Sequence, residues 1–198
     1  MSIGVAIVCY NTPELISKAV NSVFPYVTKV IIVDNSEQDS ECYRECERLS
    51  KIDNVFVIHT GENIGHGIGL NLAIKNLDTE YIICMDSDCV LLDSTLITDM
   101  QNALSEKNVY GSGRVTKLSS KLQYLYLPFC MFKKCVFEAH SPFIHHGAPF
   151  VRTMKEIRHK GLKLIQVQDY QSRIHHEGKA TRKIAGWWRK GFGGKKGI

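Results

Sequence analysis

The sequence predicts an α/β protein with a mostly parallel central sheet that is covered by helices on both faces. Two observations predict this class. Short apolar runs alternate with helical patterns over the first hundred residues, and these runs lack the polar alternation of a strand with one solvated face. The length of 198 residues suits one substantial core, and no apolar run reaches the roughly 18 residues of a membrane-spanning helix.

Four strands and four helices are predicted in alternation along the first half of the chain. The expected strands are the apolar runs at residues 3–9, 29–34, 54–60 and 80–86. The expected helices lie at residues 11–24, 37–50, 67–77 and 94–104. Thr12 and Ser94 are the expected N-caps of the first and last of these helices, and Pro13 suits a first helical position.

The second half of the chain has a weaker pattern. Strands are expected at residues 108–115, 122–134 and 162–170, with a helix at 149–161 that Gly161 ends.

The positive charge of the chain belongs to its C-terminal tail. The net charge is +5, yet the first 178 residues carry 18 basic and 20 acidic side chains and sum to −2. The tail mixes Lys and Arg with Trp187, Trp188 and Phe192. This composition suits contact with an anionic acceptor or a membrane surface, or a solvated tail whose aromatic rings pack back on the domain.

The cysteines indicate a reduced, cytoplasmic protein. There are seven, an odd number, and they fall in predicted strands and helices rather than in a disulfide framework. None forms a C-x-x-C pair, so no structural zinc site is expected. The start of the chain lacks the pattern of a signal peptide, and peripheral contact with a membrane stays open.

Polar residues follow each of the four predicted strands. They are Tyr10 and Asn11, then Asp34 and Asn35, then residues 63–69, and finally Asp86 and Asp88. Because ligands of such sheets bind beyond the carboxyl ends of the strands, we expect these residues to form one site.

Asp86 and Asp88 stand one residue apart at the end of an apolar strand. In an extended segment the two side chains point the same way, and two like charges side by side need a cation to stay ionised. A divalent metal such as Mn²⁺ or Mg²⁺ prefers hard oxygen ligands and is commonly shared with substrate phosphates. The plain alternative is a solvated loop.

Gly65, Gly67 and Gly69 invite comparison with a dinucleotide-binding loop. That fingerprint follows the first strand of its fold, where this chain has no glycine, so a Rossmann dehydrogenase is not favoured. Small residues still let a nucleotide approach the start of a helix. A simple chain-reversing turn is the alternative.

Four segments in order resemble the family-two group of nucleotide-sugar glycosyltransferases, which have the GT-A fold. They are "VAIVCYN", "VIIVDNSEQDS", "ENIGHGIGLNLAI" and "YIICMDSDCVL", and "GLKLIQVQDYQSRIHHEGKATR" is a weaker echo. The resemblance implies a GT-A-type, Rossmann-like αβα sandwich over residues 1–182. Within it, residues 1–93 would bind the donor and 107–182 the acceptor, with residues 183–198 as a basic tail.

The resemblance also implies a chemistry: transfer of a sugar from a nucleoside diphosphate donor, first of all a UDP-linked one, to an acceptor hydroxyl. It implies Mn²⁺ or Mg²⁺ held by Asp86, Asp88 and His175. The residues implied to border the nucleotide sugar are Tyr10, Asn11, Asp34, Asn35, Asn63, Gly65, Gly69, Asn71, Asp86 and Ser87. The acceptor stays open among a glycan, a lipid, a protein and a nucleic acid.

One departure from the family pattern concerns the catalytic base. Inverting members usually carry a Glu-Asp pair where this chain reads "FIHHGAPF". His146 is the first candidate base because the pKa of an imidazole lies near neutrality, and His145, Glu138 and Asp169 follow it. Inversion is the default, with a retaining transferase, a nucleotidyltransferase or a non-catalytic binding module with a basic tail as alternatives.

Overall fold

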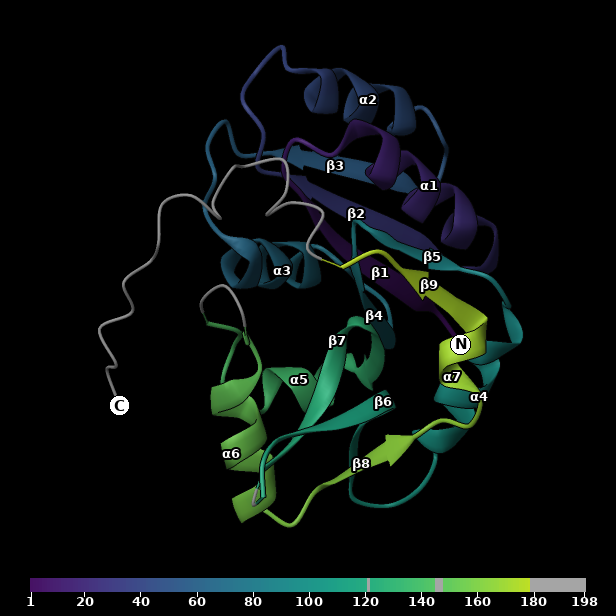
Figure 1. Ribbon diagram of the computed structural model, residues 1–198, viewed down its shortest axis with the longest axis vertical. Helices are drawn as coiled ribbons and strands as arrows, with labels where there is room; N and C mark the ends of the chain where they lie inside the picture. Colours follow the sequence, from purple (N-terminus) through teal and green to yellow (C-terminus); the bar gives the residue numbers. More distant parts are fainter. Residues whose placement is uncertain (121, 145–147, 179–198) are drawn as a thin grey trace.

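A seven-stranded sheet forms the centre of the computed structural model, which describes residues 1–120, 122–144 and 148–178 (Figure 1). The strand order is β3-β2-β1-β4-β7-β6-β8. The strands are β1 (Ile3–Cys9), β2 (Lys29–Asp34), β3 (Val55–His59), β4 (Tyr81–Asp86), β6 (Val109–Ser119), β7 (Leu122–Lys133) and β8 (Lys163–Gln166). The predicted α/β class is confirmed.

The first four strands of the sheet run parallel, and their ends are in register. Cys9 pairs with Asp34 across β1 and β2, and Val8 pairs with Asp86 across β1 and β4. The carboxyl ends of these strands therefore meet at one edge, where the polar residues of the sequence were expected to gather. Strand β7 pairs antiparallel with β4, and β6 pairs antiparallel with the other edge of β7.

Helices cover both faces of the sheet, as the continuous apolar strands predicted. One face packs against α1 (Pro13–Val23), α2 (Glu41–Leu49), α4 (Thr95–Ala103) and α7 (Tyr170–Arg173). The other face packs against α3 (His66–Lys75), α5 (Lys134–Glu138) and α6 (Val151–His159). Strand β1 serves both layers because its side chains alternate, with Val5 and Ile7 in one core and Ala6 and Val8 in the other.

A second, two-stranded sheet lies beside the main one. Strand β5 (Cys89–Leu91) follows the Asp86–Asp88 turn and pairs antiparallel with β9 (Ile174–His176). The sequence patterns did not predict β5, β9, α5, α7 or the short 3₁₀ helix η1 (Phe24–Tyr26). Each has five residues or fewer, too few to show a period.

The helix caps differ in part from the prediction. Thr12 precedes α1 as expected, but its side chain makes no capping hydrogen bond and its Oγ1 lies 3.4 Å from Oγ of Ser87. At α4 the carboxylate of Asp93, rather than Ser94, accepts the hydrogen bond of the Thr95 amide at 2.9 Å. Asp93 takes the capping role because its carboxylate reaches the free amide of the first turn.

Within the described residues, no helix combines the length and the apolar content that crossing a bilayer demands. The predicted candidates His145 and His146 and the predicted tail at residues 183–198 lie outside the part of the chain that the structure describes.

Candidate active site

Two carboxylates and one imidazole converge at the carboxyl edge of the sheet. Asp86 ends β4, Asp88 lies in the turn that follows, and His176 ends β9. The ligand atoms of the three side chains all lie within 4.8 Å of one another. Nε2 of His176 is 3.1 Å from Oδ1 of Asp88 and 3.7 Å from Oδ2 of Asp86.

The expected ligand His175 is not part of this group; its neighbour His176 is. His176 pairs with Cys89 across the small sheet, whereas His175 pairs with Val90 and is exposed. Successive side chains of a strand point to opposite faces, so only one of the two can face the Asp pair. The two histidines are adjacent in the sequence. Which of them faces the Asp pair depends on the register between β5 and β9, two segments that are about 85 residues apart.

Tyr126 on β7 fixes the orientation of His176. Its hydroxyl oxygen lies 2.8 Å from Nδ1 of the imidazole, so Nε2 is left facing the carboxylates. The guanidinium of Arg114 lies 4.9 Å from the centre of the Tyr126 ring, a cation–π contact that brings a second positive group to the site. A hydrogen bond to the far ring nitrogen is how proteins orient a metal-binding imidazole.

The charges of the site are held partly out of water. The side chains of Asp86, Asp88 and His176 are 25%, 10% and 18% exposed. Burial raises the pKa of Asp86, and the nearby charges of His66 and His176 oppose this effect. Burial disfavours the charged form of His176, but the hydrogen bond to Asp88 and the charges of both aspartates outweigh it and raise the pKa of His176.

The residue types and their spacing fit a divalent cation. Two carboxylates and a neutral imidazole supply three ligand atoms of the kinds that Mn²⁺ accepts, and the partial exposure leaves room for ligands from a substrate. His66 also lies beside the pair, with Nε2 at 3.4 Å from Oδ1 of Asp86.

The loop after β1 is tied to the loop after β2. Asn11 has a left-handed backbone with φ of 52°, and its amide donates to Oγ of Ser36 at 2.9 Å. The amide of Ser36 in turn donates to Oδ1 of Asp34 at 3.0 Å. Through Ser36, Asp34 thereby positions Tyr10 and Asn11, which are half-buried at the edge of the sheet.

Asp34 itself faces inward. Its side chain is fully buried, and Oδ2 lies 3.0 Å from Nδ1 of His59. A direct contact with a nucleobase, which the resemblance implied for Asp34, would require this side chain to leave its partners. In this structure the Asp34 carboxylate contacts Ser36 in the loop after β2 and His59 at the end of β3.

Two other predicted residues hold the third loop. The side-chain amide of Asn35 donates to Oδ1 of Asn63 at 3.3 Å, and that same oxygen accepts from the amide of Gly65 at 3.1 Å. Gly65 has a φ of 96°, which a residue with a side chain rarely adopts. This loop leads into α3, whose first residue is His66.

Gly69 and Asn71 serve packing and segment placement. A Cβ at Gly69 would lie 2.8 Å from Cγ2 of Val8, so glycine is needed for α3 to approach β1. The side chain of Asn71 donates to the carbonyl of Phe143 at 2.9 Å and accepts from its amide at 3.1 Å. Asn71 thus fixes the segment that leads to His145 and His146.

The remaining base candidates lie on different elements. Glu138 ends α5 and has Oε1 at 3.7 Å from Nζ of Lys134. Asp169 precedes α7 and helps to line a hollow of about 550 Å³ together with Arg114. Glu138 lies on α5, which covers the face of the sheet opposite to α7. Asp169 instead shares its hollow with Arg114, the residue that contacts the ring of Tyr126.

The site residues that the sequence did not indicate are His176, Tyr126, His66, Ser36 and Arg114. Of these, only His176 had a signal, because it stands in the same His pair as the residue that was chosen. The others act through contacts between distant segments.

Comparison with known proteins agrees with this arrangement. The family model described as Glycosyl transferase family 2 matches residues 4–159. A poly-beta-1,6-N-acetyl-D-glucosamine synthase of Staphylococcus epidermidis is 27% identical over 125 residues, which are 61% of this chain and 30% of that protein.

Two solved structures have a similar fold. The mannosyltransferase PcManGT of Pyrobaculum calidifontis, in complex with GDP-Man and Mn²⁺, has a TM-score of 0.72 and 17% identity, and the match covers 85% of this chain and 55% of that one. GalNAc-T7 with UDP, GalNAc and Mn²⁺ has a TM-score of 0.69 and 13% identity, covering 88% and 43%. These likenesses confirm the predicted GT-A-type fold. The chain spans about a third of the length of its curated relative and about half of these structures.

Proposed function

Because the chain belongs to glycosyl transferase family 2, we propose that it transfers a sugar from a nucleoside diphosphate donor to an acceptor hydroxyl with the help of a divalent cation. The observation that carries this proposal is the convergence of Asp86, Asp88 and His176 at the carboxyl edge of the sheet. In folds of this kind that edge is where nucleotides bind.

Asp86, Asp88 and His176 would hold the cation, with Mn²⁺ as the first candidate and Mg²⁺ as the second. When bound, such an ion neutralises the charge that develops on the departing diphosphate. The chain's own residues prepare the site: Tyr126 directs Nε2 of His176 toward the carboxylates. Arg114, stacked on Tyr126, is placed to add positive charge beside a diphosphate.

The donor nucleotide is assigned to the loops after β1, β2 and β3. Tyr10 and Asn11 would border the base, with Asn35, Asn63 and Gly65 shaping the wall beside them and Ser87 in the Asp-Ser-Asp turn close to the ribose. Asp34 and Asn71 would act by holding these loops. A UDP-linked sugar is the first candidate donor and GDP-Man the second, since each nucleotide occurs in a similar solved structure.

We assign to His146 the role of the base that removes the proton of the acceptor hydroxyl, with His145 and Asp169 as the next candidates. A base on the acceptor side gives inversion, which is the default of the proposal. The alanine variant of His146 should lower transfer far more than donor binding. Unchanged transfer in that variant would show that His146 is not the base and would favour a retaining reaction.

The basic tail is assigned to the acceptor, as a contact with an anionic molecule or membrane surface. Removal of residues 183–198 should weaken acceptor binding more at low salt than at high salt, because exposed charges are screened as the salt concentration rises. Equal acceptor affinity with and without the tail, at every salt concentration, would remove this role.

A thermal-shift screen tests the donor class and the cation together. UDP, GDP, their sugars, UTP and GTP would each be added with and without Mn²⁺, and a ligand that binds only the folded protein raises its melting temperature. We expect at least one nucleoside diphosphate to stabilise the protein, and to do so only with the cation present. Stabilisation by a nucleoside triphosphate alone would favour a nucleotidyltransferase, and no response to any nucleotide would favour a non-catalytic binding module.

A further inference from the structure

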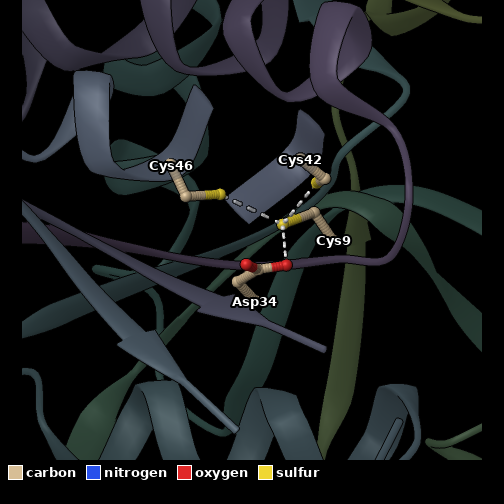
Figure 2. Close-up of side chains that lie close together, drawn as sticks. All are labelled: Cys9, Asp34, Cys42 and Cys46. Atoms are coloured by element: carbon tan, nitrogen blue, oxygen red, sulfur yellow. Dashed lines mark hydrogen bonds between the residues drawn. The ribbon is translucent and has the colours of Figure 1, made fainter. Parts of the chain in front are cut away.

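Three cysteines and one aspartate form a second cluster on the α2 side of the sheet, apart from the Asp86–Asp88 pair (Figure 2). Cys9 and Asp34 are the last residues of β1 and β2 and are register partners, so their side chains point to the same face. Cys42 and Cys46 stand one helical turn apart on the buried face of α2, which packs over that face. Three separate elements thus deliver four ligand groups to one place.

The spacing of these groups is that of a tetrahedral metal site. Sγ of Cys9 lies 3.6 Å from Sγ of Cys46, 3.8 Å from Sγ of Cys42 and 3.6 Å from Oδ1 of Asp34. All four ligand atoms lie within 4.8 Å of one another. Zinc–sulfur bonds of about 2.3 Å at tetrahedral angles separate two sulfurs by about 3.8 Å, and a carboxylate oxygen at about 2.0 Å lies about 3.5 Å from each sulfur.

The cluster is closed to solvent. Cys9 and Cys42 are 1% exposed, and Cys46 and Asp34 are fully buried. A site with four protein ligands and no access for water is of the structural type rather than the catalytic type. Thiolate ligands favour zinc over Mn²⁺ or Mg²⁺, which take oxygen ligands.

A surrounding layer holds the carboxylate in place. Oδ2 of Asp34 lies 3.0 Å from Nδ1 of His59, while Nε2 of the same ring lies 2.8 Å from Oε1 of Glu47 on α2. The ring of Tyr43 stacks on His59 at 3.9 Å. Outer contacts of this kind orient metal ligands, and here they leave Oδ1 directed at the sulfurs.

We propose that Cys9, Asp34, Cys42 and Cys46 bind one zinc ion as a structural site that fastens α2 to the carboxyl ends of β1 and β2. This inference goes beyond the proposed transferase activity and does not depend on it. The site lies under the loops of Asn11 and Ser36, so zinc would stabilise the floor of the proposed donor site. The alternative is three buried thiols that share weak hydrogen bonds, since cysteine is a common core residue.

Cobalt is the probe that tests the proposal. The full-length protein, reduced and freed of metal, would be titrated with Co²⁺, because thiolate ligands give a charge-transfer band that oxygen and nitrogen ligands lack. We expect the band to saturate at one Co²⁺ per chain and to disappear when one equivalent of Zn²⁺ is added. The Asp88→Asn variant should keep the band, because Asp86, Asp88 and His176 include no sulfur. Absence of the band from the wild-type protein would overturn the proposal.

Variants assign the ligands. Cys42→Ser and Cys46→Ser should each weaken the band, and the double variant should lose it. Cys130→Ser is the matched control, because Cys130 is equally buried in the sheet but outside the cluster, and it should keep the full band. A band of wild-type strength in the folded double variant would contradict the assignment.

The wild-type protein alone provides a second measurement if the variants fail to fold. X-ray absorption at the zinc edge counts the ligands of the zinc-loaded chain. We expect three sulfur neighbours at about 2.3 Å and one oxygen neighbour. A shell of oxygen and nitrogen only would show a thiol cluster that binds no metal and would overturn the proposal.

Discussion

The imidazole of His176 lies with Nε2 at 3.1 Å from Oδ1 of Asp88, and this contact joins β9 to the turn after β4. It brings the last described strand of the chain to the carboxyl edge of the parallel strands. The small sheet of β5 and β9 decides which of two adjacent histidines takes this place.

The first prediction compares those two histidines. His176→Ala should abolish most of the stabilisation that Mn²⁺ gives to the protein, because it removes one of three ligands of the proposed site. His175→Ala is the control and should leave the response to Mn²⁺ unchanged, because that side chain is exposed and pairs with Val90. Thermal denaturation with and without Mn²⁺ measures both variants. The reverse result, with loss only in His175→Ala, would show that β9 has another register.

The second prediction concerns Tyr126, which holds the far nitrogen of His176 at 2.8 Å. Tyr126→Phe keeps the ring and its stacking with Arg114 but removes the hydroxyl. Loss of such an orienting contact costs about 10- to 100-fold in metal affinity, so we expect Mn²⁺ to bind that much more weakly. Tyr26→Phe, at an exposed tyrosine, is the control. Calorimetric titration that gives equal affinities for Tyr126→Phe and the wild type would remove this role.

The third prediction tests the link between α3 and the segment before His145. Asn71→Ala leaves the amide and the carbonyl of Phe143, a residue 2% exposed, without their partners. An unpaired buried group costs about 1–3 kcal/mol, so the free energy of unfolding should fall by about that amount. Asn76→Ala removes a hydrogen bond of similar length to Leu72 at the exposed end of the same helix and should cost less. Urea denaturation compares the two, and equal losses would mean that the Phe143 contact adds nothing specific.

The fourth prediction is a pH dependence at Glu156. A hydrogen bond from Lys160, with a second from the amide of Ser141, lowers the pKa of Glu156 from 4.5 to about 2. A carboxylate with a lowered pKa in the folded state stabilises the protein above its unfolded pKa, and this stabilisation disappears as the pH falls. The wild type should therefore lose stability between about pH 4.5 and 2 more steeply than Glu156→Gln. Urea denaturation over this range measures the slopes, with Glu106→Gln as a surface control. Parallel curves for the wild type and Glu156→Gln would contradict the prediction.

The sequence was sufficient for the parts of the fold that depend on local pattern. Continuous apolar runs predicted β1 to β4, and helical periodicity predicted the helices between them. A strand that is buried on both faces is apolar along its whole length, so the sequence of that one segment is enough to identify it. The Asp86–Asp88 pair could also be recognised from the sequence. Two like charges at the end of an apolar strand stand out within a single segment, without knowledge of the tertiary fold.

What the sequence did not predict depends on contacts between distant segments. His176 rather than His175 faces the Asp pair because of the register between β5 and β9. The contact of the buried Asp34 carboxylate with His59 likewise joins two strands that are 25 residues apart. The Cys9, Cys42 and Cys46 cluster has no C-x-x-C spacing because its members come from a strand and a helix that the tertiary fold brings together.

The most direct test of the proposed function is the release of nucleoside diphosphate from a nucleotide sugar, measured with Mn²⁺ for the wild type, Asp88→Asn and Asp53→Asn. The asparagine at residue 88 keeps the shape of the site but removes one charge of the proposed metal site, whereas Asp53 is an exposed residue elsewhere on the surface. We expect release that depends on the cation in the wild type and in Asp53→Asn, and none above background in Asp88→Asn. Release at the wild-type rate by Asp88→Asn, or by the wild type in metal-free buffer, would contradict a cation-dependent transferase built on Asp86, Asp88 and His176.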